Sequence, residues 1–192
     1  MGTYIFFLIL WIYFLSIFKR NELGFYYFLF GSVGTFVFLL IGFLDKLIEP
    51  LSQLVAYLVG LFNNIIPGIQ TFSQHKLIFL ETDIPISLYI DFECSGILEI
   101  FAFISLICFF ASYNLLSKIA IIFSGTIYII FANVLRILSI ILIINTFGSE
   151  YYYIAHTIIG RLVFYVLTIA LYFKIFTKQQ IVNQKVGNFN YD

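Results

Sequence analysis

Charge is scarce in this sequence: 10% of its 192 residues are charged, while 62% are hydrophobic. Soluble globular domains carry roughly 25% charged residues, so this composition excludes that class. No cluster of basic residues is present, which argues against nucleic acid as a partner. Several apolar runs are instead long enough to cross a hydrocarbon core of roughly 30 Å, which takes about 20 helical residues. We therefore expect an all-α polytopic membrane protein.

Other signals are missing as well. The two cysteines are too few for a disulfide framework. The chain shows no internal repeat and no low-complexity tract. Its first apolar run, from Tyr4 to Phe18, lacks the basic start and the small-residue cleavage site of a signal peptide. We interpret that run as a retained membrane span.

Apolar segments predict a bundle of five to six transmembrane helices. The five clearest spans run over about 3–18, 24–44, 95–112, 119–144 and 154–175. A sixth segment, 47–66, contains Gln53, Asn63 and Asn64 and ends at Pro67-Gly68. That segment could be an interfacial helix, a re-entrant segment or a span.

Basic residues predict the orientation, because cytoplasmic loops are enriched in them. They follow the first span, lie between the spans 95–112 and 119–144, and mark the C-terminal tail: Lys19, Arg20, Lys118, Lys174, Lys178 and Lys185. Placing all six inside puts the N-terminus outside and the C-terminus inside, provided that 47–66 does not cross. We expect one domain over 1–178 and a cytoplasmic tail over 179–192. Residues 67–93 would be its outer loop, where "KLIFL" and "ISLYI" predict a hairpin around "ETDIP".

Under this orientation, three reactive side chains fall in the outer half of the membrane. Cys94 and His156 each lie at the outer end of a span. Arg136 lies roughly 12 Å deep in another, where a lone arginine costs on the order of 2.5–3.5 kcal/mol. A neighbouring cation favours the nucleophilic thiolate, and a histidine can take and return the proton. Arginine donors can stabilise an oxyanion, so the set suits acyl transfer.

Three further charged residues lie near this set. Glu99 and Arg161 follow Cys94 and His156 by five residues each, so they lie at matching depths of about 7.5 Å. We expect them to pair as a clamp between two helices. Glu93 neighbours Cys94, where an anion raises a thiol pKa. We expect it to bind substrate or to turn toward water.

Zinc binding is the competing interpretation of this set. Cys94, His156 and one glutamate could supply three ligands. The sequence has no short-spaced ligand pair such as H-E-x-x-H or C-x-x-C. We therefore expect no metal and no other cofactor. Cys108, which lies within an apolar run, is interpreted as a packing residue, and His75 as a solvated one.

Three short motifs resemble those of the exosortase/archaeosortase family of membrane transpeptidases. They are "ECSGI" at Glu93–Ile97, "NVLR" at Asn133–Arg136 and "HTIIGR" at His156–Arg161. That family carries a cysteine in a C-S-G setting, an N-x-x-R motif on a later helix and a third basic residue on a still later one. The resemblance implies that Cys94 is the nucleophile and that Arg136 and His156 are the other catalytic residues. The supporting residues would be Glu93, Ser95, Glu99, Asn133 and Arg161.

The resemblance also implies a function. The protein would be a cysteine peptidase or transpeptidase of the plasma membrane with its active site facing outside. Its partner would be an exported protein with a C-terminal hydrophobic sorting signal. Cleavage at the outer face would end in hydrolysis or in transfer to a lipid or cell-surface acceptor. The chain looks most like the small Gram-positive variants.

One alternative belongs to another functional class. The protein could be a non-catalytic membrane partner or a small-solute transporter, with Arg136 and Glu99 lining a polar path. A transporter should tolerate serine or alanine in place of Cys94, whereas the enzyme should not.

Overall fold

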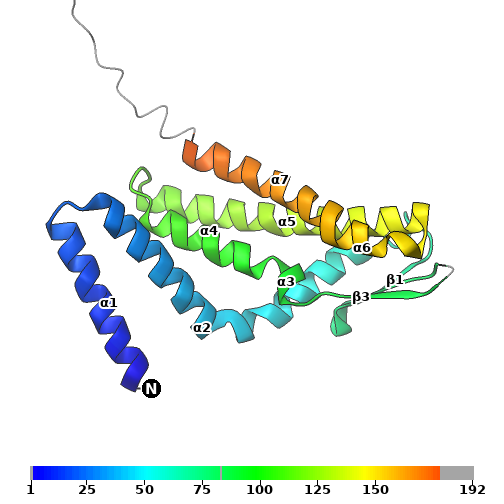
Figure 1. The fold of residues 1–192 in the computed structure, drawn as a ribbon, viewed down its shortest axis with the longest axis horizontal. Coiled ribbons are helices and arrows are strands. Elements are labelled where there is room, and N and C mark those ends of the chain that lie inside the picture. Colours follow the sequence, from blue (N-terminus) through cyan, green and yellow to red (C-terminus); the bar gives the residue numbers. More distant parts are fainter. Residues whose placement is uncertain (1, 83, 178–192) are drawn as a thin grey trace, which may run out of the picture.

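The protein is a helical bundle with a small sheet at one end (Figure 1). The structure, a computed structural model, describes residues 2–82 and 84–177, without the side chains of residues 2–5 and of Glu93. In chain order the elements are α1 (Gly2–Arg20), α2 (Gly24–Gly60), β1 (Ile69–Phe72), η1 (Ser73–His75), β2 (Leu77–Leu80), β3 (Ile86–Tyr89), α3 (Phe92–Ser95), α4 (Ile97–Phe109), α5 (Leu115–Phe147), η2 (Ser149–Tyr151), α6 (Tyr152–Ile154), η3 (Ala155–Ile159), α7 (Gly160–Tyr172) and η4 (Phe173–Thr177). The predicted tail at 179–192 lies outside the described residues.

Within the described part of the chain, three helical runs are long and apolar enough to cross a membrane: α2, α5 and the run Ser149–Thr177. The predicted class, a mainly helical membrane protein, is therefore confirmed. Helix α4 is shorter than the span expected at 95–112, because its 13 residues reach only about 20 Å. The count of five crossings stays a prediction.

The separation of 24–44 from 47–66 in the sequence analysis is wrong. The segment 24–44 and residues 47–60 of the second segment belong to α2, which stays helical from Gly24 to Gly60 with Pro50 inside it. Proline kinks a helix without having to end it, and Figure 1 shows α2 bending toward the sheet. Val55, Ala56 and Val59 of its second half are fully buried, so packing holds this half in place. Because one helix cannot reverse its direction, 47–60 makes no separate return crossing.

The three strands form an antiparallel sheet in the order β1-β2-β3. The predicted hairpin is confirmed: Leu80 pairs with Ile86, and Leu77 with Tyr89. Strand β1 was not predicted, and its Ile69 pairs with Leu80 on the other side of β2.

The buried face of the sheet packs against the bundle. Alternation along β2 buries Ile78 and Leu80, which join α2 and α5 in one hydrophobic cluster. A second cluster joins α4, α5 and α7 around Phe103, Ile129 and Phe164. Helix α5 contributes to both clusters. Asn133 and Arg136 lie on α5 at the place where the two clusters meet.

Candidate active site

Cys94 lies on α3, a single helical turn between the sheet and the bundle. Asp91 caps this turn, since its Oδ1 accepts a hydrogen bond from the Phe92 N–H at 2.7 Å. Gly96 ends the turn with φ +79°, a left-handed conformation that favours glycine. Cys94 therefore stands on its own turn ahead of α4, whereas the sequence predicted it at the start of a longer helix.

Ser95 and Asn133 hold this turn against the bundle. The Ser95 hydroxyl donates to the Phe92 carbonyl at 2.9 Å and accepts from the Ile97 N–H at 3.3 Å. It thus joins α3 to α4 across Gly96. Asn133 of α5, which is fully buried, donates from Nδ2 to the Cys94 carbonyl at 2.6 Å. The backbone of Cys94 is therefore positioned by side chains on both sides.

Two basic side chains converge on the Cys94 sulfur. His156 Nε2 lies 3.6 Å from Sγ, and Arg136 donates from Nη2 to the same atom at 3.7 Å. The three residues come from α3, α5 and η3, which are far apart in the sequence. The three residues expected to be catalytic thus lie together around one thiol.

Arg136 is held inside the bundle although it is a cation. Only 6% of it is exposed. Its guanidinium lies over the Phe164 ring of α7, with 5.8 Å between Cζ and the ring centroid. This cation–π contact gives the cation a favourable environment away from water and fixes its position.

His156 lies on a short π-helical segment, η3, which precedes α7. Such segments often occur at functional sites. The Tyr152 ring stacks on the imidazole with 5.7 Å between centroids and 16° between planes. Sequence reasoning missed Tyr152, although its position one helical turn before His156 is a signal that could have pointed to it.

The expected clamp between Glu99 and Arg161 is not formed. The Arg161 side chain is exposed, and Glu99, which is half-buried, lies within electrostatic range of Arg136 and Tyr172 instead. Equal depth in two helices does not set the direction in which side chains point. The π-helical segment η3, which the sequence does not reveal, also changes the rotation between His156 and Arg161.

The remaining predicted residues lie outside this cluster. Cys108 is exposed at the far end of α4, and His75 is exposed on η1. The Glu93 side chain lies outside the described part of the chain. Among the described residues, no group of three His, Cys, Asp or Glu side chains could hold a metal ion.

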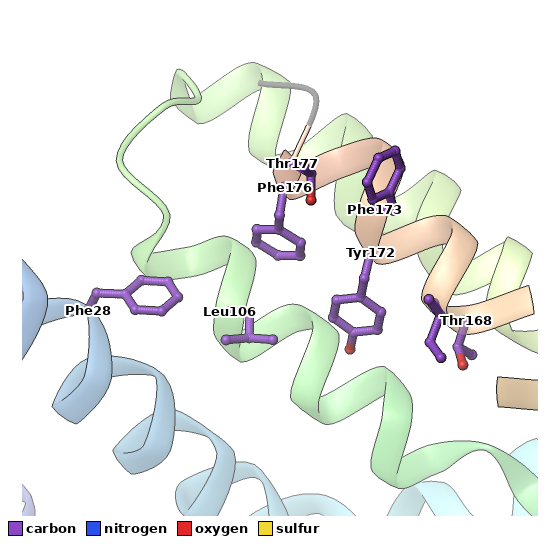
Figure 2. Close-up of a pocket in the computed structure, with 8 residues that line it drawn as sticks. Phe28, Leu106, Thr168, Tyr172, Phe173, Phe176 and Thr177 are labelled. Carbon is purple, nitrogen blue, oxygen red and sulfur yellow. The ribbon is translucent and has the colours of Figure 1, made fainter. Parts of the chain in front are cut away.

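An apolar groove with a volume of about 570 Å³ lies at the opposite end of the bundle (Figure 2). Leu106 of α4 and Tyr172 of α7 point into it from facing helices. It shares no residue with the cluster around Cys94, and its lining contains no cysteine and no histidine. The candidate active site is therefore the cluster around Cys94 and not this groove.

A comparison with known families finds a match to this chain. A family model described as transmembrane exosortase matches residues 1–173. No curated protein and no solved structure matches the chain. Exosortases are membrane-embedded sorting transpeptidases that act on exported proteins with C-terminal sorting signals. Because the match covers most of its length, the chain belongs to the transmembrane exosortase family.

Proposed function

We propose that this exosortase is a cysteine peptidase or transpeptidase that cleaves C-terminal sorting signals of exported proteins at the outer face of the plasma membrane. The single observation that carries the proposal is the convergence of His156 and Arg136 on the Cys94 sulfur, at 3.6 and 3.7 Å. A thiol used only for packing needs neither a base nor a cation at this distance.

His156 generates the nucleophile. Its Nε2 takes the Cys94 proton, and the positive charge of Arg136 stabilises the thiolate that forms. The sulfur attacks the carbonyl carbon of the scissile peptide bond, so that an S–C bond forms and the carbonyl oxygen becomes an oxyanion. Arg136 has several donors in a rigid fork, and one of them can stabilise this oxyanion while another stays near the sulfur.

Collapse of the intermediate breaks the C–N bond. The imidazolium of His156 gives its proton to the departing amine, which carries away the C-terminal signal. The exported protein remains attached to Cys94 as a thioester. Water, or an amine or hydroxyl of a lipid or cell-surface acceptor, then attacks that carbonyl and regenerates the thiol. The mass of the released protein distinguishes hydrolysis from transfer.

The experiment compares the membrane-associated exported proteins of cells that make the wild type, Cys94→Ala or Cys108→Ala. We expect uncleaved proteins with an apolar C-terminal segment to accumulate only in Cys94→Ala cells. Cys108→Ala is the matched control, since that thiol lies outside the cluster. Normal processing by Cys94→Ala would reject the peptidase and favour the non-catalytic alternative.

A further inference from the structure

Strand β3 leaves one row of backbone groups open. The Ile90 N–H donates to the Lys76 carbonyl at 2.9 Å, on the β2 side of the strand. Because hydrogen-bonded and non-hydrogen-bonded pairs alternate in an antiparallel ladder, Ile86 and Leu88 also direct their backbone groups toward β2. Ser87 and Tyr89 therefore direct their N–H and C=O groups toward the open edge. Among the described residues, none takes up these groups.

The opposite edge of the sheet is covered. Strand β1 packs against α2, and Asn63 beyond the end of α2 donates to the Thr71 hydroxyl at 3.0 Å. Gly60 approaches Thr71 so closely that a β-carbon would not fit. Within the described chain, β3 packs extensively against β2 alone. An open edge of this kind is a template for another extended chain.

The open edge leads to the candidate nucleophile. Figure 1 shows β3 running directly into α3, which carries Cys94. Ile90, between the two, is 2% exposed and anchors the junction. An extended chain paired with β3 would therefore be aligned along a path that continues to the thiol.

A cavity of about 300 Å³ lies beside this strand. Ile84 and Ile86 of the hairpin form one wall, and Ser149, Glu150 and Tyr152 form the other. Its lining is mainly apolar. Tyr152 also stacks on His156, so the cavity and the catalytic centre share a wall.

We propose that the open edge of β3 binds the exported protein just before its cleavage site, as an added strand with an apolar side chain in the cavity beside Ile86 and Tyr152. This inference rests on the proposed function. An extended segment exposes the peptide bond that the thiol attacks, whereas a helix keeps its carbonyls hydrogen-bonded. The backbone groups of Ser87 and Tyr89 supply affinity without regard to sequence, and the cavity supplies selectivity.

The test removes one outward N–H. Ser87→Pro deletes a donor on the open edge, where proline is tolerated, and leaves the bonds to β2 intact. Ser73→Pro is the matched control, because Ser73 begins η1, a position that suits proline. The measured quantity is the rate at which cells cleave the exported proteins that remain uncleaved in Cys94→Ala cells. We expect about a tenfold slower rate for Ser87→Pro and a rate within about twofold of wild type for Ser73→Pro.

The outcomes separate the two claims. Equal rates for the two proline variants, with Cys94→Ala inactive, would overturn the strand addition and leave the proposed function standing. Normal processing by Cys94→Ala would overturn both.

A second measurement decides the matter if Ser87→Pro fails to fold. In the Cys94→Ala protein, a photoreactive benzoylphenylalanine at position 87 should crosslink to the accumulated uncleaved proteins. The same group at the exposed position 74 on η1 should not. Equal crosslinking at both positions, or none at 87, would contradict the proposal.

Discussion

Asn133 and Arg136 both bind Cys94, Asn133 at its backbone and Arg136 at its side chain. Asn133 Nδ2 donates to the Cys94 carbonyl at 2.6 Å, while Arg136, one helical turn further along α5, donates to the Cys94 sulfur at 3.7 Å. A single helix therefore fixes both the main chain and the thiol of Cys94, the candidate nucleophile. The N-x-x-R spacing has a structural reason here, because residues three apart lie on the same helix face.

The first prediction follows from this contact. Asn133→Ala should lower the free energy of unfolding by about 1–3 kcal/mol, because it leaves the Cys94 carbonyl without its buried partner. It should also slow processing, since the Cys94 thiol is then no longer held in place beside His156. Thermal unfolding in detergent and the rate of processing measure the two effects.

Asn145→Ala is the matched control for Asn133→Ala. Asn145 lies on the same helix and donates to the Pro67 carbonyl at 3.0 Å, but it is exposed. Water can replace that bond, so we expect a smaller loss of stability and normal processing. Equal effects of the two substitutions would contradict the positioning role of Asn133.

The second prediction compares the contributions of Arg136 and Arg161 to processing. Arg136→Lys should slow processing by about a hundredfold, because an ammonium keeps the charge but loses the fork of donors. Arg161→Lys should process normally, since that side chain is exposed. A comparable loss with Arg161→Lys would mean that the Arg161 guanidinium also contributes to processing, which would contradict this assignment.

The third prediction concerns the turn after the nucleophile. Gly96→Ala should lower the free energy of unfolding by roughly 1–2 kcal/mol, because φ is +79° there. Space is not the obstacle, as a β-carbon would lie 3.6 Å from Asn133. Gly42→Ala within α2, where an added β-carbon would meet no atom of another part of the protein within 4 Å, should be neutral or stabilising. Thermal unfolding of both variants checks this, and equal stability would contradict the conformational argument.

The sequence was informative where a property depends on residue type along the chain. Apolar runs marked the helices, and the short stretches "KLIFL" and "ISLYI" on either side of "ETDIP" marked the hairpin. Properties that depend on packing in three dimensions were not accessible in this way. Gln53, Asn63 and Asn64 suggested that 47–66 is a separate segment, yet packing of Val55 and Val59 keeps α2 helical to Gly60.

In the candidate site, too, some features follow from residue type and others depend on packing. Cys94, Arg136 and His156 could be named from chemistry and motif order. The outward direction of Arg161 and the Asn133 bond to the Cys94 carbonyl depend on helix rotation, which the sequence does not state. The Tyr152 ring on His156 likewise depends on the π-helical segment η3.

The fourth prediction tests the orientation inferred from the lysines. Single cysteines at Ser87 and Ser117, both exposed, are introduced into a Cys94→Ala, Cys108→Ala background. An impermeant maleimide should label position 87 in intact cells and position 117 only after lysis. Labelling of both positions from the same side would contradict an active site on the outer face.

The most direct measurement is the detection of a thioester on Cys94. Enzyme purified rapidly from cells should carry a fraction of exported protein that hydroxylamine releases, and the attachment should map to the peptide containing Cys94. Cys94→Ala should carry none, whereas Cys108→Ala should carry as much as wild type. Attachment at Cys108, or continued processing by Cys94→Ala without any adduct, would contradict the account.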